Sequence, residues 1–94
     1  MTDEEIAFYD IIMAGREYLE NDTVARKIAI DLVDYLKKNL KIDWLNQDQV
    51  KAEIRNGVRK ILLKENFPVD EIEKVIPVIM QQTETNYREV SFEN

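Results

Sequence analysis

Basic side chains recur every four residues across the middle of the sequence, in Lys51, Arg55 and Arg59, and Lys60 and Lys64 follow on a neighbouring line. On a helix, residues four apart share one face, so this cationic row could contact the phosphates of a nucleic acid or an acidic protein surface. A solvated helix face would show the same spacing. The row is the clearest candidate for a binding surface, and the kind of partner stays open.

The acidic residues gather in two clusters, residues 3–5 and 70–73, and such clusters can ligate metals or act in acid–base catalysis. Each cluster stands where a helix is expected to begin, and the positive end of the helix dipole favours carboxylates there. The chain has no His and no Cys, which removes thiol nucleophiles, histidine-based triads, disulfides and nearly every zinc site. Phosphate-binding glycine motifs are absent as well. We therefore expect no catalytic residue, metal or cofactor in this chain.

Length and charge narrow the class of protein further. The chain has 94 residues, enough for one domain, and a net charge of −6. Nucleic-acid binding draws much of its affinity from cations, so the chain as a whole disfavours that partner. No apolar run approaches the roughly 20 residues needed to cross a bilayer, and the N-terminus is acidic where a signal peptide is basic. We expect a soluble protein of the cytoplasm.

Four amphipathic helical segments are predicted to position these residues, at 3–19, 24–40, 47–65 and 70–83. Each carries an apolar stripe of helical period, and short connections join them. This pattern predicts that residues 1–94 form a single domain of the all-α class. We expect a compact bundle of about four helices with a frayed C-terminal tail. The expected core consists of Ile6, Ile28, Leu32, Leu36, Trp44, Val50, Ile54, Ile61, Leu62, Ile72 and Ile76.

Local signals mark the ends of these segments. Thr2 and Glu5 have the spacing of a capping box at the start of the first segment. Asn46 and Asp70 are the expected N-caps of the third and fourth segments. In the first segment Ile6, Tyr9, Met13 and Arg16 fall on one stripe.

Two prolines bear on the last segment. Pro68 interrupts the helical pattern just before the fourth segment, because a proline restricts its own φ and the conformation of the preceding residue. Pro77 lies inside the segment, removes one hydrogen bond and should kink the helix. Two short helices, with Pro77 at the start of the second, are the alternative. From residue 81 the chain is polar, and although Tyr87 and Phe92 could dock, we expect the tail to fray.

The single Trp stands between the second and third segments, in Ile42-Asp43-Trp44. We expect an extended connection that tucks Ile42 and Trp44 beneath the neighbouring helices. The apolar residues around Trp44 favour a place in the core over an interface, and its indole N–H then needs an acceptor. Gly57, within the third segment, would permit a close helix contact or would be a plain surface substitution, and the sequence does not choose.

An ordered series of motifs runs through residues 26–70. It consists of Arg26-Lys27-Ile28-Ala29, Asn39 with Ile42-Asp43-Trp44, Val58-Arg59-Lys60-Ile61-Leu62, and Phe67-Pro68 with Asp70. Over about residues 4–80 the chain resembles the C-terminal helical domain of the R subunit, the restriction and motor subunit, of type I restriction–modification enzymes. It departs from that family at Leu45, Asn66 and Pro77, where the family has Thr, Gly, and Glu or Ala.

The resemblance implies a parent enzyme that translocates DNA with ATP and Mg²⁺ and then cleaves it. The motor and nuclease motifs are missing here, so we expect an excised C-terminal fragment of a larger R subunit that is not an enzyme by itself. In the family this region is implicated in docking the R subunit onto the methyltransferase core of modification and specificity subunits. The expected partner-binding residues are Lys51, Arg55, Arg59, Lys60, Lys37 and Lys38, and the expected structural residues are Trp44, Ile42, Asp43, Pro68 and Asp70.

Two alternatives stay open. The cationic row could contact DNA within the larger complex, or the chain could be a free-standing helical regulator. Salt-sensitive binding of a DNA duplex would favour the first. A reading frame that does not continue upstream into a P-loop ATPase would favour the second.

Overall fold

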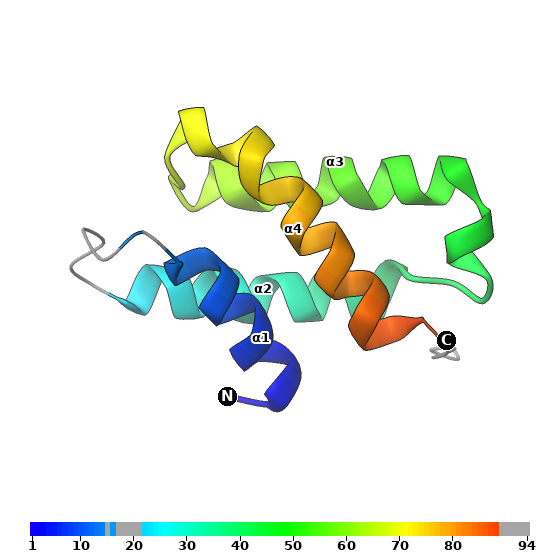
Figure 1. Cartoon of the computed structure of the whole chain (residues 1–94), viewed down its shortest axis with the longest axis horizontal. Helices are drawn as coiled ribbons and strands as arrows, with labels where there is room; N and C mark the ends of the chain where they lie inside the picture. The colour runs from blue at the N-terminus through cyan, green and yellow to red at the C-terminus, as the bar shows by residue number, and fades with distance from the viewer. Residues whose placement is uncertain (15, 17–21, 89–94) are drawn as a thin grey trace.

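The computed structural model describes residues 1–14, 16 and 22–88. It contains four α-helices and one short 3-10 helix, in the order α1 (Asp3–Met13), α2 (Asp22–Asn39), η1 (Trp44–Asn46), α3 (Asp48–Lys64) and α4 (Val69–Tyr87) (Figure 1). The described part of the chain contains no strand. The prediction of an all-α bundle of four helices is confirmed. None of these helices is long and apolar enough to span a membrane.

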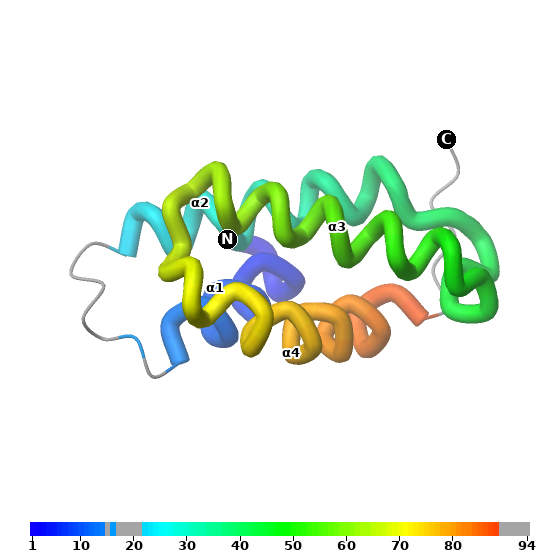
Figure 2. The backbone as a smooth tube through the Cα atoms, turned by 90° about the horizontal axis from the view of Figure 1, so that it is seen from above, coloured from blue at the N-terminus to red at the C-terminus, as the bar shows by residue number. Residues whose placement is uncertain are grey.

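The helices form two layers. α2 and α3 run side by side in opposite directions, and η1 lies in the connection between them (Figure 1). α1 and α4 lie on the same side of this pair (Figure 2). α1 contacts both α2 and α4, and α3 contacts α2, α4 and η1. The core therefore lies between the layers, where each helix can bury one face.

The core is contiguous and mostly as predicted. Ile6 is an error, because it is 41% exposed. In α1 the buried face belongs to Phe8 and Ile12, which are four residues apart, and Ile6 lies about 200° around the helix from Phe8. Val50 and Ile61 are only partly buried at its edge. The buried apolar residues are Phe8, Ile12, Ala25, Ile28, Ala29, Leu32, Val33, Leu36, Leu40, Trp44, Ile54, Val58, Leu62, Phe67, Ile72, Val75, Ile76, Ile79 and Tyr87.

The first helix begins where predicted and ends early. The Thr2 hydroxyl accepts from the Glu5 amide at 3.2 Å, and Glu5 Oε1 accepts from the Thr2 amide at 2.7 Å, so the capping box is confirmed. The helix ends at Met13, because Ala14 leaves the helical region with a ψ of 119°. The predicted helix 3–19 is thus too long, and its residues 17–19 lie outside the described part of the chain.

The starts of α3 and α4 correct two predicted caps. Asn46 lies inside η1, and Gln47 precedes α3 without a side-chain cap. Pro68 occupies the cap position of α4, so Asp70 sits in the first turn and makes no cap hydrogen bond. The Pro68 carbonyl instead accepts from the Glu71 amide at 2.9 Å.

α4 is one helix through Pro77 and continues to Tyr87, four residues past the predicted end. The alternative of two short helices is therefore wrong. Buried Val75, Ile76 and Ile79 flank the proline, and their packing offsets the hydrogen bond it removes. Buried Thr83 and Tyr87 extend the apolar face, so the chain does not fray from residue 81. Residues 89–94, with Phe92, lie outside the described part of the chain.

Candidate functional site

The predicted cationic row is divided by an ion pair between helices. Arg59 donates through Nε and Nη2 to the two carboxylate oxygens of Glu73 on α4, at 2.8 and 2.9 Å. Its Nη1 donates to Asn56 Oδ1 at 2.6 Å. Hydrogen bonds between the two groups raise the pKa of Arg59 and lower the pKa of Glu73. Arg59 thus links α3 to α4 and is already engaged within the domain.

The other predicted partner-binding cations are distributed over the surface. Lys60 is exposed and lies about 140° around α3 from Arg55, five residues away at about 100° each. On α2, Lys37 pairs with Glu4 at 3.7 Å and Lys38 pairs with Asp34 at 3.0 Å. The structure therefore does not bring these three lysines to the face that carries Arg55.

Lys51 and Arg55 remain at the N-terminal half of α3. Within the described chain their side chains have no ion pair and no hydrogen bond; Arg55 is exposed and Lys51 is half-buried. With Gln47, which precedes α3, they stand four residues apart on one face. We call Gln47, Lys51 and Arg55 the α3 stripe. Lys60 and Lys64, on the neighbouring line of the predicted row, also have no ion pair among the described residues.

The turn before η1 lies next to the α3 stripe. Gln47 Nε2 donates to the Ile42 carbonyl at 3.3 Å. Ile42 itself is 68% exposed, which contradicts the prediction that it is tucked beneath the helices. Asp43 adopts a left-handed conformation with a φ of 62°, and this sharp turn sends Ile42 outward while Trp44 turns inward. The segment is a turn and a 3-10 helix rather than an extended connection.

Trp44 is in the core, as predicted. It is 2% exposed, and its indole N–H donates to the Tyr87 carbonyl at the end of α4, at 3.2 Å. The Tyr87 hydroxyl donates to Glu4 Oε2 on α1 at 2.7 Å. Burial, and then the hydrogen bond to Glu4, raise the pKa of Tyr87 well above that of an ordinary tyrosine. The ring thus joins the α2–α3 connection to α4, and Tyr87 continues the link to α1.

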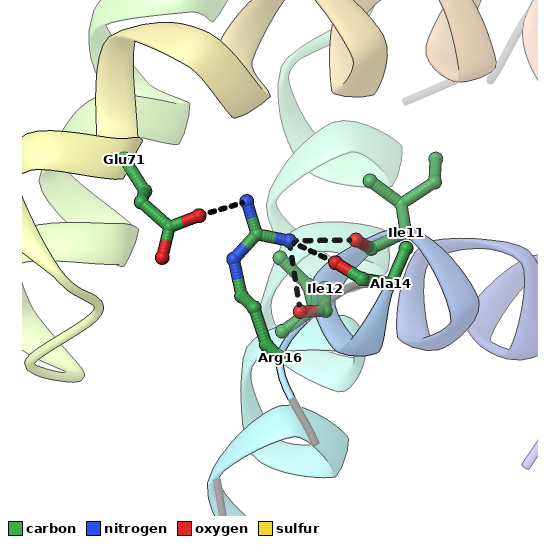
Figure 3. Close-up of polar contacts among 5 residues, drawn as sticks. All are labelled: Ile11, Ile12, Ala14, Arg16 and Glu71. Carbon is green, nitrogen blue, oxygen red and sulfur yellow. Dashed lines mark hydrogen bonds and ion pairs between the residues drawn. The ribbon is translucent and has the colours of Figure 1, made fainter. Parts of the chain in front are cut away.

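Arg16 is the buried charge whose role the sequence does not reveal. Its Nη1 donates to the carbonyl oxygens of Ile11, Ile12 and Ala14 at 3.3, 3.2 and 2.9 Å, and its Nη2 pairs with Glu71 at 3.0 Å (Figure 3). The residue is only 7% exposed. A charge on an apolar stripe was the available signal, but the contacts are those of a C-terminal cap rather than of a helix interior.

Gly57 serves a close helix contact. A Cβ added to Gly57 would lie 1.9 Å from the hydroxyl oxygen of Tyr35 on α2. The Tyr35 ring therefore lies directly over α3, and its hydroxyl donates to the Glu53 carbonyl at 3.3 Å. The sequence left open a close helix contact or a plain surface substitution at Gly57, and the structure shows the close contact.

Open grooves mark the surface of the described part of the chain, and they include the following pair. One, of about 320 Å³, lies between α1 and α4 and has Ile11, Val75 and Val78 in its lining. The other, of about 260 Å³, lies between α2 and α3, beside Tyr35 and Ile61. Among the described residues no group of three acidic side chains is placed to hold a metal ion. The contacts of Arg16, Arg59 and Trp44 hold the elements of the domain together, and the α3 stripe is the candidate binding surface.

Comparison with known proteins places the chain in a family. A family model described as "Type I restriction enzyme HindI endonuclease subunit-like, C-terminal" matches residues 1–89. The Type I restriction enzyme HindI endonuclease subunit of Haemophilus influenzae is 34% identical over 86 residues, which cover 89% of this chain and 8% of that relative. No solved structure matches the chain. The chain therefore belongs to the family of C-terminal domains of HindI-like type I restriction endonuclease subunits.

Proposed function

We propose that this domain is an assembly module of a type I restriction endonuclease R subunit. It docks that subunit onto the methyltransferase core formed by the modification and specificity subunits. The observation that carries the proposal is the family match over residues 1–89 to the C-terminal part of an endonuclease subunit. The fold supports it, because the described helices bury a contiguous core among themselves and leave apolar and cationic side chains on their outer faces.

The chemistry of the whole enzyme belongs, in this proposal, to other parts of the R subunit. The chain spans 8% of the length of the Haemophilus relative. We propose that the ATP-driven translocase and the nuclease, with their ATP and Mg²⁺, lie outside this domain. The domain itself acts in the cytoplasm as a binding module and not as an enzyme.

Direct contact with DNA is the second candidate, and the unpaired cations Lys51, Arg55 and Lys60 are the observation in its favour. Against it stands the net charge of −6, which repels phosphates at long range. If DNA contact is the function, the chain retards a labelled duplex at about 50 mM salt and releases it at about 200 mM.

Deletion of the domain tests the assembly function. An R subunit that lacks the segment corresponding to residues 1–89 should remain soluble but should no longer co-purify with the modification and specificity subunits. The 94-residue chain, added in excess, should compete with the intact R subunit for the same core. Normal assembly of the truncated subunit, together with no competition by the chain, would rule out the proposal.

A further inference from the structure

We propose that the α3 stripe and the exposed Ile42 form one docking surface for an acidic segment of a partner protein. The segment places carboxylates opposite Lys51 and Arg55 and an apolar side chain against Ile42. This inference rests on the proposed assembly function and adds the position and the chemistry of its contact.

The first argument is the distribution of ion pairs. Seven of the 13 Lys and Arg side chains form an ion pair with a described carboxylate, and even the highly exposed Lys38 and Arg88 have partners one turn away. The six that do not are Lys41, Lys51, Arg55, Lys60, Lys64 and Lys74. Arg59, at the end of the same row as Lys51 and Arg55, is held by both oxygens of Glu73. Lys51 and Arg55 have no such partner among the described residues. In an acidic domain, two adjacent unneutralised cations provide a local positive surface that attracts carboxylates.

The second argument is that the turn fixes Ile42 in solvent. Asp43 is left-handed, a conformation that residues other than glycine, asparagine and aspartate seldom adopt. Its carbonyl accepts from the Asn46 amide at 3.1 Å, and its carboxylate accepts from the Asn46 side chain. On the other side, Trp44 is held in the core by Tyr87. A turn held by these hydrogen bonds on both sides of Asp43 reduces the entropy loss of ordering its backbone on binding.

The third argument is continuity. Gln47 joins the two parts, because its side chain donates to the Ile42 carbonyl while its backbone carbonyl accepts from the Lys51 amide at 3.0 Å. Hydrogen bonds thus link Gln47 to both Ile42 and Lys51, and Arg55 follows one turn later on the same face. We call these four residues the strip, with Ile42 at its apolar end and Lys51 and Arg55 at its cationic end.

The apolar end favours a protein over a nucleic acid as the occupant. A phosphate backbone gains from Lys51 and Arg55 but offers little to an isoleucine that is 68% exposed. A protein segment with carboxylates and one apolar side chain satisfies both ends of the strip.

The test compares two charge reversals of equal size in the intact R subunit. Lys51→Glu with Arg55→Glu changes the strip, and Lys60→Glu with Lys74→Glu changes two other exposed lysines that have no ion pair among the described residues. Ile42→Ser removes the apolar end alone. Binding to the purified modification–specificity core is measured by titration at two salt concentrations. Circular dichroism of the same variants in the 94-residue chain confirms that they fold.

We expect the strip reversal to weaken binding at least about tenfold and the control reversal to change it less than about twofold. Ile42→Ser should weaken binding by about three- to tenfold. Equal effects of the two reversals would overturn the inference, as would a strip reversal that abolishes duplex binding while core binding stays unchanged. If the strip reversal is without effect and deletion of the domain still prevents assembly, the inference fails and the assembly function stands.

Discussion

Replacement of Arg16 by methionine tests how the end of α1 is stabilised. The guanidinium donates to three carbonyl oxygens at the end of the helix and pairs with Glu71. Its central carbon also lies 4.8 Å from the centre of the Phe67 ring. Methionine has a similar apolar stem but no hydrogen-bond donor, so Arg16→Met removes these contacts and keeps most of the packing.

The expected loss follows from the geometry. The three carbonyl oxygens share one nitrogen, so we count them as a single charge-assisted cap of about 1.5–3 kcal/mol. The contact with Phe67 adds about 0.5–1 kcal/mol. The Glu71 side chain is 28% exposed and regains water in the variant, so its loss costs less than the roughly 3–5 kcal/mol of a fully buried pair. Arg16→Met should lower the free energy of unfolding by about 2–4 kcal/mol.

Urea unfolding of the 94-residue chain, followed by far-ultraviolet circular dichroism, measures this difference. Arg26→Met is the matched control, because the Arg26 side chain is 59% exposed and pairs with Asp22 on the same helix. The control should change the free energy of unfolding by less than about 0.5 kcal/mol. A loss below about 1 kcal/mol for Arg16→Met, or equal losses in the two variants, would contradict the capping role.

Three further variants test other contacts. In a Tyr35→Ala background, Gly57→Ala should raise the free energy of unfolding by about 0.8–1 kcal/mol, because only its helix propensity acts. With Tyr35 present, the same change should lower the free energy of unfolding, because the new Cβ would lie 1.9 Å from the Tyr35 hydroxyl oxygen and must displace the ring. Additive effects in urea titrations would show that the ring does not press on Gly57. Trp44→Phe should lower the free energy of unfolding by about 2–4 kcal/mol, because it removes the indole N–H that donates to the Tyr87 carbonyl and leaves a gap beside that carbonyl. A decrease below about 1 kcal/mol would argue against the indole link. Tyr87→Phe should be less stable than the unmodified chain at pH 7, and the difference should narrow above about pH 10. The raised pKa means that Tyr87 holds its proton more tightly in the folded than in the unfolded chain. The stabilisation by Tyr87 is therefore complete below the pKa of the unfolded state and declines above it. A difference in the free energy of unfolding between the two chains that stays constant from about pH 7 to 11 would exclude this linkage.

Features set by short-range chemistry were predictable from the sequence. The capping box of Thr2 and Glu5 depends on residues three apart, and the structure has it as expected. The helical period assigns four helices, and it places Ile28, Leu32 and Leu36 of α2 in the core. Burial of Trp44 followed from its apolar neighbours, and so did the need for an acceptor, although not its identity.

Features that depend on which helices meet could not be predicted. Periodicity places Arg59 on a face of α3, but only the packing of α4 brings Glu73 within 2.8 Å of it. Arg16 lies beyond the end of α1, and its side chain folds back onto the last carbonyl groups of that helix. Helical spacing cannot predict this contact, because Arg16 is not in the helix. The Tyr87 hydroxyl meets Glu4 across 83 positions, which ordered the last turns of α4 where polar composition suggested fraying.

The inward-facing indole gives the domain an intrinsic optical reporter. Trp44 is the sole tryptophan and is shielded from water, so its emission in the folded state comes from an apolar environment and should shift to longer wavelength when α4 separates from η1. Ile42, two residues away, is exposed to solvent. A partner that binds there would leave the emission nearly unchanged, and fluorescence can therefore distinguish occupation of the strip from loosening of the bundle.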